Sequence, residues 1–125
     1  MPASISILSR KVLLDDSSVT WISEPMNWVG YKQADLYLQV HGCAVDNTVY
    51  LQIEGASETG ENATWTTLAA PSGFADSAVL TDIGRNRYIR QDLYPYERVK
   101  VIIGGTGVLK AAEVSVNGQL HEELS

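Results

Sequence analysis

The sequence predicts an all-β protein, an antiparallel β-sandwich of the jelly-roll kind, on two observations. Short runs of residues alternate between apolar and polar side chains, and clusters of turn-forming residues separate these runs. No stretch of ten or more residues has the spacing of an amphipathic helix. A chain of 125 residues with 45% hydrophobic side chains suits one core, so we expect a single domain over residues 1–125.

Four runs show the clearest alternation, with apolar side chains on one face of each predicted strand. These runs are residues 35–41, 49–54, 98–103 and 112–117. The first two are predicted to be consecutive antiparallel strands joined by a short loop. The last two are separated by the glycine-rich segment 104–107, where glycine supplies the positive φ angles of a tight reversal. This segment lacks the spacing of a phosphate-binding loop, so it predicts a turn.

Six weaker strands and four turn clusters fill most of the remaining sequence. The strands are expected at residues 4–8, 11–14, 19–22, 64–68, 78–80 and 88–91. The turns are expected at residues 15–18, 55–60, 71–73 and 84–86, where Gly, Asn, Asp, Ser, Glu, Thr and Pro gather. Many short strands between such turns are typical of a sandwich or a closed jelly roll.

The N-terminal segment, residues 1–14, differs from the rest because Ser and Arg interrupt its short apolar stretches. Two interpretations are open: the segment is the first strand of its own sandwich, or it is an arm or edge strand that pairs with a neighbouring chain. In the second case, apolar side chains of the segment would contact the partner. These side chains are Ile5, Ile7, Leu8, Val12 and Leu13.

Charge and composition argue against several classes of function. The net charge of −6, with no basic stripe to offset it, disfavours nucleic acid as a partner. The N-terminus lacks the pattern of a secretory signal, and no apolar run approaches the roughly 20 residues of a membrane helix. We therefore expect folding in the cytoplasm and no membrane contact. Cys43 is the only cysteine, so the fold is expected to form without an internal disulfide.

The sequence offers little for catalysis or for a cofactor. His41 and His121 have no second histidine or cysteine at ligand spacing, and the turn carboxylates are expected to be solvated rather than to bind calcium. The Gly-x-Ser-x-Gly motif is absent, and a small sandwich rarely leaves a deep pocket. We therefore expect a protein that has no catalytic residues, no metal site and no cofactor.

Aromatic residues near predicted strand ends are the most informative side chains that remain. Trp28, Tyr31, Tyr94 and Tyr96 either stack against sugar rings on an exposed face or pack at the ends of the sandwich and in a subunit interface. Because the tryptophans are few and widely spaced, packing or an interface is favoured. Trp65 is expected to be a core residue.

The order of features over about two thirds of the chain resembles a known family. The features are the strand 34–40, the strand and loop 49–57, the hairpin end 64–68, the Arg-Tyr-Ile-Arg run 87–90, Pro95 and the strand 98–101. In this order they resemble the small jelly-roll head decoration (cement) proteins of tailed bacteriophages. A looser similarity links them to discoidin-like carbohydrate-binding domains, but the chain is shorter than those and lacks their paired cysteines.

The phage resemblance implies a non-catalytic virion protein of the capsid surface, made in the host cytoplasm. It also implies a homotrimer that clamps neighbouring subunits of the major capsid protein, with residues 1–14 as the candidate arm. The alternative is a carbohydrate-binding module for host or glycan recognition. A tail or baseplate component would share the same fold.

Overall fold

Strands arranged in two antiparallel sheets form the protein. The computed structural model describes residues 3–15, 19–68, 79–80 and 83–123, and this part of the chain contains ten strands and no helix. The strands are β1 (Ala3–Asp15), β2 (Val19–Ile22), β3 (Met26–Asn27), β4 (Gln33–Cys43), β5 (Asn47–Ala56), β6 (Thr66–Leu68), β7 (Val79–Leu80), β8 (Gly84–Arg90), β9 (Tyr96–Gly105) and β10 (Lys110–His121).

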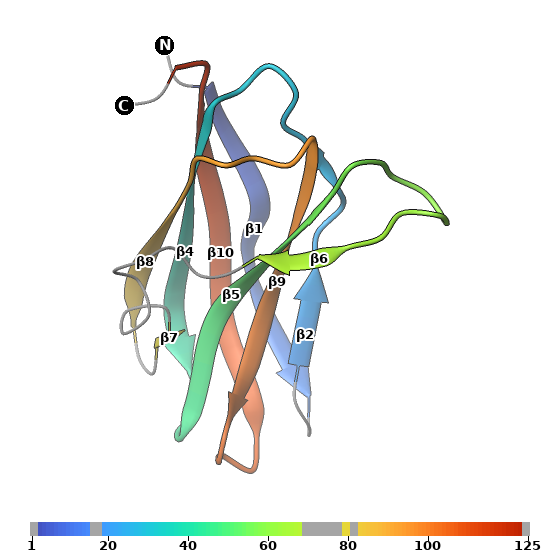
Figure 1. The fold of residues 1–125 in the computed structure, drawn as a ribbon. Helices are drawn as coiled ribbons and strands as arrows, with labels where there is room; N and C mark the ends of the chain where they lie inside the picture. Colours follow the sequence, from blue (N-terminus) through green and yellow to red (C-terminus); the bar gives the residue numbers. More distant parts are fainter. Residues whose placement is uncertain (1–2, 16–18, 69–78, 81–82, 124–125) are drawn as a thin grey trace.

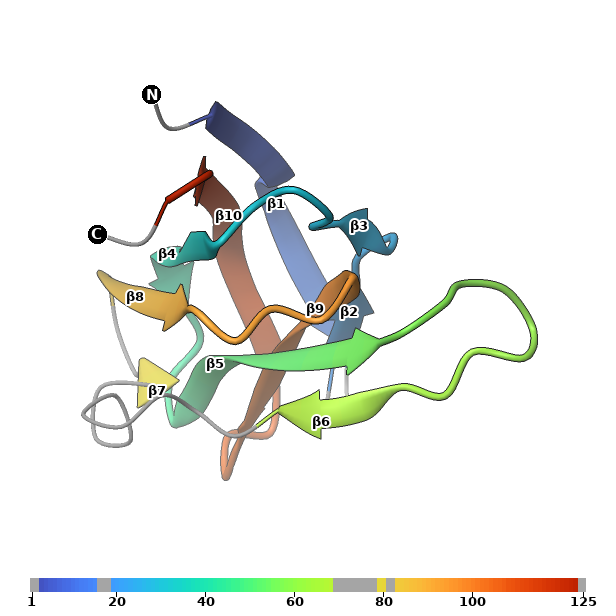
Figure 2. The same cartoon turned by 45° about the horizontal axis from the view of Figure 1, so that its top comes forward.

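The two sheets pack face to face as a sandwich. The first sheet has the strand order β1-β10-β4-β8, and the second has the order β2-β9-β5-β6, with β3 added beside β9 and β7 beside β5. Figure 1 shows the long strands running along the sandwich, and the tilted view of Figure 2 separates the two layers. Longer strands that follow one another in sequence mostly cross from one sheet to the other, which is the connectivity of a jelly roll and confirms the predicted fold class.

These crossings differ from the simplest expectation for the strongest runs. β4 and β5 are consecutive, but β4 pairs with β10 and β8, whereas β5 pairs with β9. The reversal after β9 likewise leads into the opposite sheet. Alternation specifies which side chains face the core, and strands of both sheets face the same core, so the pattern does not reveal which strands pair.

The weaker runs were placed correctly in part. The strand at 19–22 is confirmed, whereas 4–8 and 11–14 form one continuous strand, β1, with register shifts between Ser6 and Lys11. The turn expected at 84–86 is wrong, because these residues belong to β8 and pair with β4. Their turn-like composition is overridden by that pairing. The turn expected at 71–73 and most of the one expected at 15–18 lie outside the described residues.

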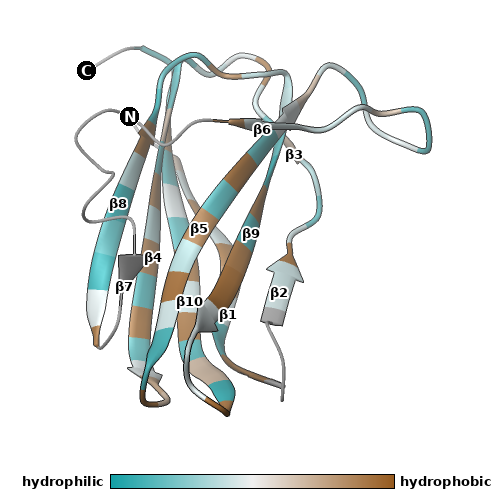
Figure 3. Cartoon of the chain, turned by 60° about the horizontal axis from the view of Figure 1, so that its bottom comes forward, coloured by the Kyte–Doolittle hydropathy of each residue, from teal (hydrophilic) through white to brown (hydrophobic). Residues whose placement is uncertain are grey.

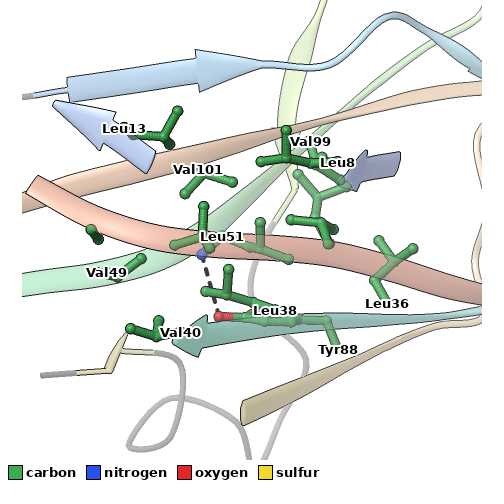
Figure 4. Packing of buried hydrophobic residues seen from close by; sticks show 14 of the residues in the cluster. Leu8, Leu13, Leu36, Leu38, Val40, Val49, Leu51, Tyr88, Val99 and Val101 are labelled. Atoms are coloured by element: carbon green, nitrogen blue, oxygen red, sulfur yellow. Dashed lines mark hydrogen bonds between the residues drawn. The ribbon is translucent and has the colours of Figure 1, made fainter. Parts of the chain in front are cut away.

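The core lies between the sheets and is built mainly from Leu and Val. Leu36, Leu38 and Val40 of β4 face the apolar side chains of β5 and β9, as Figure 4 shows. Tyr88 of β8 lies among them, and its hydroxyl accepts a hydrogen bond from the Leu51 N–H group at 3.3 Å, which links the two sheets. Burial raises the pKa of the Tyr88 hydroxyl, although the bond from Leu51 opposes this effect.

The N-terminal segment belongs to this sandwich as an edge strand. β1 pairs with β10 from Ala3 to Asp15, and the side chains of Leu8 and Leu13 are part of the core. The middle of β1 carries the register shifts together with the charged residues Arg10 and Lys11. Bulges and charges on an edge strand discourage pairing with another chain. Residues 3–15 are thus the first strand of their own sandwich and lie at the edge of its first sheet, while contact of this edge with a neighbouring chain stays a prediction.

Candidate functional site

The side chains of β1 that the sequence proposed for partner contact are divided between the core and the surface. Leu8 and Leu13 are buried, and Ile5 and Ile7 are half-buried against the core. Val12 alone among the five is well exposed. Alternation explains the opposite positions of Val12 and Leu13, whereas the register shifts between Ser6 and Lys11 allow the consecutive residues Ile7 and Leu8 both to pack against the core.

The four proposed aromatic residues also differ in accessibility. Trp28 is only 3% exposed and belongs to the core, whereas Tyr94 is 37% exposed. Tyr31 and Tyr96 are half-buried. Trp28, like Leu8 and Leu13, is therefore mainly a packing residue in this structure, and contact of these three side chains with a partner stays a prediction.

Four of the nine proposed residues line one groove, which has a volume of about 460 Å³. It lies between β1 and the segment from β2 to the start of β4, where the edges of the two sheets meet. Ile5, Ile7, Trp28 and Tyr31 line it together with Trp21, Ser6, Ser23, Glu24, Pro25, Met26, Asn27 and Leu120. The other five, Leu8, Val12, Leu13, Tyr94 and Tyr96, do not line this groove.

Backbone hydrogen bonds position the aromatic residues of the groove. The Trp28 N–H group donates to the Pro95 carbonyl at 2.8 Å, and the Tyr31 N–H group donates to the Trp28 carbonyl at 3.0 Å. Within the described part of the chain, the indole N–H of Trp28 is buried and has no hydrogen-bond partner. Because this atom is shielded from solvent, it does not offer a donor to a molecule in the groove.

An ion pair supports the segment that carries Pro95. The Glu97 carboxylate is fully buried and accepts hydrogen bonds from Arg90 Nη2 at 3.1 Å and from the Tyr94 N–H group at 3.0 Å. Arg90 also donates to the Asp92 carbonyl at 3.1 Å. Burying a carboxylate is costly unless it is paired and hydrogen-bonded, and here it is both. The pair thus orders the β8–β9 connection against which Trp28 packs.

The opposite end of the sandwich carries exposed apolar side chains on two loops and on β1. Val45 of the β4–β5 loop is 80% exposed and Val108 of the β9–β10 loop is 94% exposed. Val12, Leu14 and Leu109 are also exposed, and we call these five residues the apolar end. Figure 3 shows the hydrophobic colour of both loops. This end lies opposite the described ends of the chain (Figure 1).

The two loops of the apolar end are held together by one buried side chain. Asn47 is 1% exposed, and its Nδ2 donates to the carbonyls of Val45 at 3.1 Å and Leu109 at 2.9 Å. Its Oδ1 accepts from the Ala111 N–H group at 2.9 Å. The Lys110 ammonium donates to carbonyls of the β9–β10 loop. The exposed valines are therefore presented on a rigid frame.

Close approach of the two loops explains the glycine-rich segment. Gly105 has a φ of 97°, which confirms the positive φ angle expected there. At both Gly105 and Gly107, an added Cβ atom would collide with the backbone of the β4–β5 loop. The sequence predicted the turn but not the apolar end. A signal was present in the sequence: Val45 stands next to Asp46 and Val108 next to Gly107, at turn positions where polar residues are usual.

A charged cluster on the outer face of the second sheet involves Trp65. The guanidinium of Arg98 lies 4.3 Å from the centroid of the Trp65 ring and donates to Glu54 at 2.7 Å, while Lys100 lies 3.2 Å from the same carboxylate. Burial alone would raise the pKa of Glu54, but these two cations hold it below its ordinary value of 4.5. Trp65 is half-buried and outside the core cluster, so its expected core position is wrong.

One pair of side chains has the spacing of a nucleophile and a base. His41 Nε2 lies 3.0 Å from Ser115 Oγ on the outer face of the first sheet. Ser115 lies within β10, between β1 and β4, rather than on the sharp turn that presents the serine of a hydrolase. The carboxylate of Glu113, the nearest acid along β10, is bound by Arg10 at 2.7 Å, and this partner lowers its pKa. The pair therefore lacks the setting that would activate it.

The described part of the chain contains neither a cluster of metal ligands nor a helix suited to a membrane. Among residues 3–15, 19–68, 79–80 and 83–123, no three His, Cys, Asp or Glu side chains come together in a way that could hold a metal ion. The same part of the chain contains no helix that is long and apolar enough to cross a membrane.

Comparison with known proteins places this chain by its fold. It matches no family model and no curated protein sequence. Solved structures of infectious bursal disease virus do match: a chain of the Gt strain structure has a TM-score of 0.54 and 13% identity, and a chain of the Gx strain structure has 0.54 and 14%. Each match covers 96% of this chain but only 33% and 30% of the viral chains, so this chain spans about a third of their length. At this identity, the match establishes a shared fold with chains of a virus.

Proposed function

We propose that this chain is a non-catalytic structural protein of a virus particle. More specifically, we propose that it decorates or cements a bacteriophage capsid by binding subunits of the major capsid protein. The proposal of a role in a virus particle is supported by the structural similarity of nearly the whole chain to chains from a virus. The proposal of capsid decoration is supported by the resemblance of residues 34–116 to phage decoration proteins. The single observation that carries the binding role is the apolar end, whose side chains are exposed and whose two loops are joined by the hydrogen bonds of Asn47.

The apolar end supplies the driving force of the proposed contact. Fully burying one Val or Leu side chain contributes about 1.5–3 kcal/mol, and the loops that carry these side chains are already ordered. Binding would therefore cost little conformational entropy. In the two loops, the ammonium of Lys110 is bound to carbonyls, which leaves Asp46 as the one exposed charge of residues 44–48 and 106–110. Such a surface avoids the repulsion that a net charge of −6 produces elsewhere.

The mechanism proposed for the apolar end is stabilisation by mass action. A protein that binds the assembled shell but not its free subunits shifts the equilibrium toward the shell. Three copies around a symmetry axis, as the phage resemblance implies, would each direct an apolar end at the lattice and multiply the contact area. The proposed role does not require an N-terminal arm, because β1 is part of the sandwich.

The first test is fractionation of virus particles from the source of this sequence. Particles are banded on a density gradient, separated into heads and tails, and probed with an antibody against the purified protein. We expect the chain in the head fraction. Recovery in the tail fraction would assign it to a tail or baseplate instead, and absence from all particles would refute a virion role.

The second test links the binding to the apolar end. The double variant Val45→Asp, Val108→Asp is added to shells that lack the protein, and its co-sedimentation is compared with that of the wild type. Val29→Asp is the matched control, because Val29 is an exposed valine of the β3–β4 connection and does not belong to the apolar end. We expect the double variant to lose binding and the control to retain it. Equal binding by all three proteins would refute the proposed surface.

A further inference from the structure

A second, polar groove crosses the outer face of the first sheet. It has a volume of about 380 Å³ and lies over β1, β10, β4 and β8. Its lining consists of Ser4, Ile5, Ser6, Tyr37, Arg85, Asn117, Gly118 and Gln119. A volume of this size falls at the lower end of the range of about 300–1,000 Å³ that small-molecule sites occupy.

Strand register explains why polar side chains converge there. On β10, Val116 and Leu120 face the core, so Asn117 and Gln119 point outward. Ser6 lies directly opposite Asn117, and Tyr37 lies opposite it on the other side. Three neighbouring strands thus place hydroxyl and amide groups in one row, where each can donate and accept hydrogen bonds.

These groups have no partners within the described part of the protein. No hydrogen bond joins the side chains of Ser4, Ser6, Asn117 or Gln119 to another of the described residues. Neighbouring polar groups on the same sheet differ, since the carboxylate of Asp35, for example, accepts from Gln33 at 2.8 Å and lies 3.2 Å from His121. The side chains of Ser4, Ser6, Asn117 and Gln119, by contrast, are unpaired among the described residues.

The groove also contains one cationic side chain, Arg85. The guanidinium of Arg85 lies 4.2 Å from the centroid of the Tyr37 ring and forms no ion pair with a described residue. Stacking on the ring orients the planar group and leaves its N–H edge available for a carboxylate, which guanidinium binds through two parallel hydrogen bonds. The neighbouring Arg87 lies outside the groove, 3.8 Å from Asp35.

We propose that this groove binds an acidic saccharide, a sugar whose carboxylate pairs with Arg85 and whose hydroxyl groups bond to Ser6, Asn117 and Gln119. Hydroxyls that donate and accept match the sugar ring, and the lone guanidinium matches its acid. The residues differ from the aromatic side chains that the sequence suggested for sugar contact. The site goes beyond the proposed structural role and does not rest on it, because the apolar end lies elsewhere on the molecule.

The test is a titration of the full, ¹⁵N-labelled chain followed by amide chemical shifts. The probes are 3′-sialyllactose and glucuronic acid as acidic sugars, lactose as the neutral sugar and sodium sulfate as an anion alone. We expect both acidic sugars to shift the signals of Ser6, Asn117 and Gln119. Arg85→Gln should weaken this binding about tenfold or more, the usual effect of losing a charge-assisted bond.

The matched control is Arg87→Gln, an exposed arginine two residues along the same strand. It should change the affinity by no more than about twofold, as ordinary surface substitutions do. Folding of each variant is checked by its unperturbed amide spectrum. The proposal is overturned if no probe shifts these signals, if sulfate or lactose reproduces the shifts of the acidic sugars, or if both arginine variants weaken binding equally.

Discussion

Replacement of Asn47 by alanine is the sharpest test of the frame beneath the apolar end. The side chain is 1% exposed and forms three hydrogen bonds, two from its amide nitrogen to the carbonyls of Val45 and Leu109 and one to its amide oxygen from Ala111. Alanine removes all three and leaves their partly buried partners without these bonds. Because the bonds connect two loops that are distant in sequence, no local rearrangement can restore them.

The magnitude follows from these contacts. A typical intramolecular hydrogen bond contributes about 1 kcal/mol net, so the loss of three predicts a decrease in unfolding free energy of about 3 kcal/mol. With an m value of about 2 kcal/mol per M, the urea midpoint should fall by about 1.5 M. The loosened loops should also weaken binding through the apolar end, since the bound geometry is no longer ordered in advance.

Urea unfolding followed by tryptophan fluorescence measures this loss. Asn117→Ala is the matched control, because Asn117 is exposed and forms no hydrogen bond with a described residue. It should stay within about 0.5 kcal/mol of the wild type. A loss below about 1 kcal/mol for Asn47→Ala, or one no larger than the control, would refute the idea that this side chain holds the loops.

The aspartate variant adds a pH-dependent check. Asn47→Asp keeps the oxygen that accepts from Ala111, but near neutral pH it places a buried carboxylate against two carbonyl oxygens. It should be at least as unstable as Asn47→Ala near pH 7. Protonation of the carboxyl group restores one donor, so its stability relative to the wild type should improve as pH falls. A pH-independent difference would contradict the assigned geometry.

Three further predictions concern the sheets. The folded-state pKa of Glu54 is lowered below 4.5 by cations that include Arg98, so the stabilising contribution of this carboxylate is present above pH 4.5 and is lost as pH falls through the folded-state pKa. Glu54→Gln should therefore flatten the dependence of unfolding free energy on pH in this acidic range, and an unchanged dependence would contradict the assigned ion pairs. Trp65→Ala should cost about 1–2 kcal/mol in urea unfolding, because the ring is half-buried and stacks on Arg98; a loss above about 3 kcal/mol would return it to the core. Deletion of residues 1–10 should abolish the near-ultraviolet circular dichroism of the fold, because it removes Leu8 from the core and uncovers β10; a deleted chain that stays folded would support the arm interpretation.

Much of the fold was predictable because alternation is a local property. The inward faces of Leu36, Leu38 and Val40, and of the matching residues on the other strong strands, follow directly from a side-chain period of two. The need for glycine at 105 was also predictable in part, since reversal of the chain requires unusual φ angles. These features depend on neighbours within a few positions along the chain.

The candidate sites were less predictable because they depend on contacts between distant segments. Trp28 is buried because the β8–β9 connection packs against it, and nothing near Trp28 in sequence specifies that contact. Val45 and Val108 form one surface only because Asn47 joins loops that are more than 60 residues apart. The outward row of the polar groove likewise requires the register between three strands.

The sequence by itself therefore determined an all-β sandwich, the inward faces of its main strands and several of its turns. Tertiary structure alone decided which strands pair, that residues 3–15 complete the first sheet, and which apolar and polar side chains meet on the surface. The physical reason is that both sheets bury their apolar faces in the same core, so the local pattern is satisfied by many pairings. Only the packing of the whole chain selects one of them.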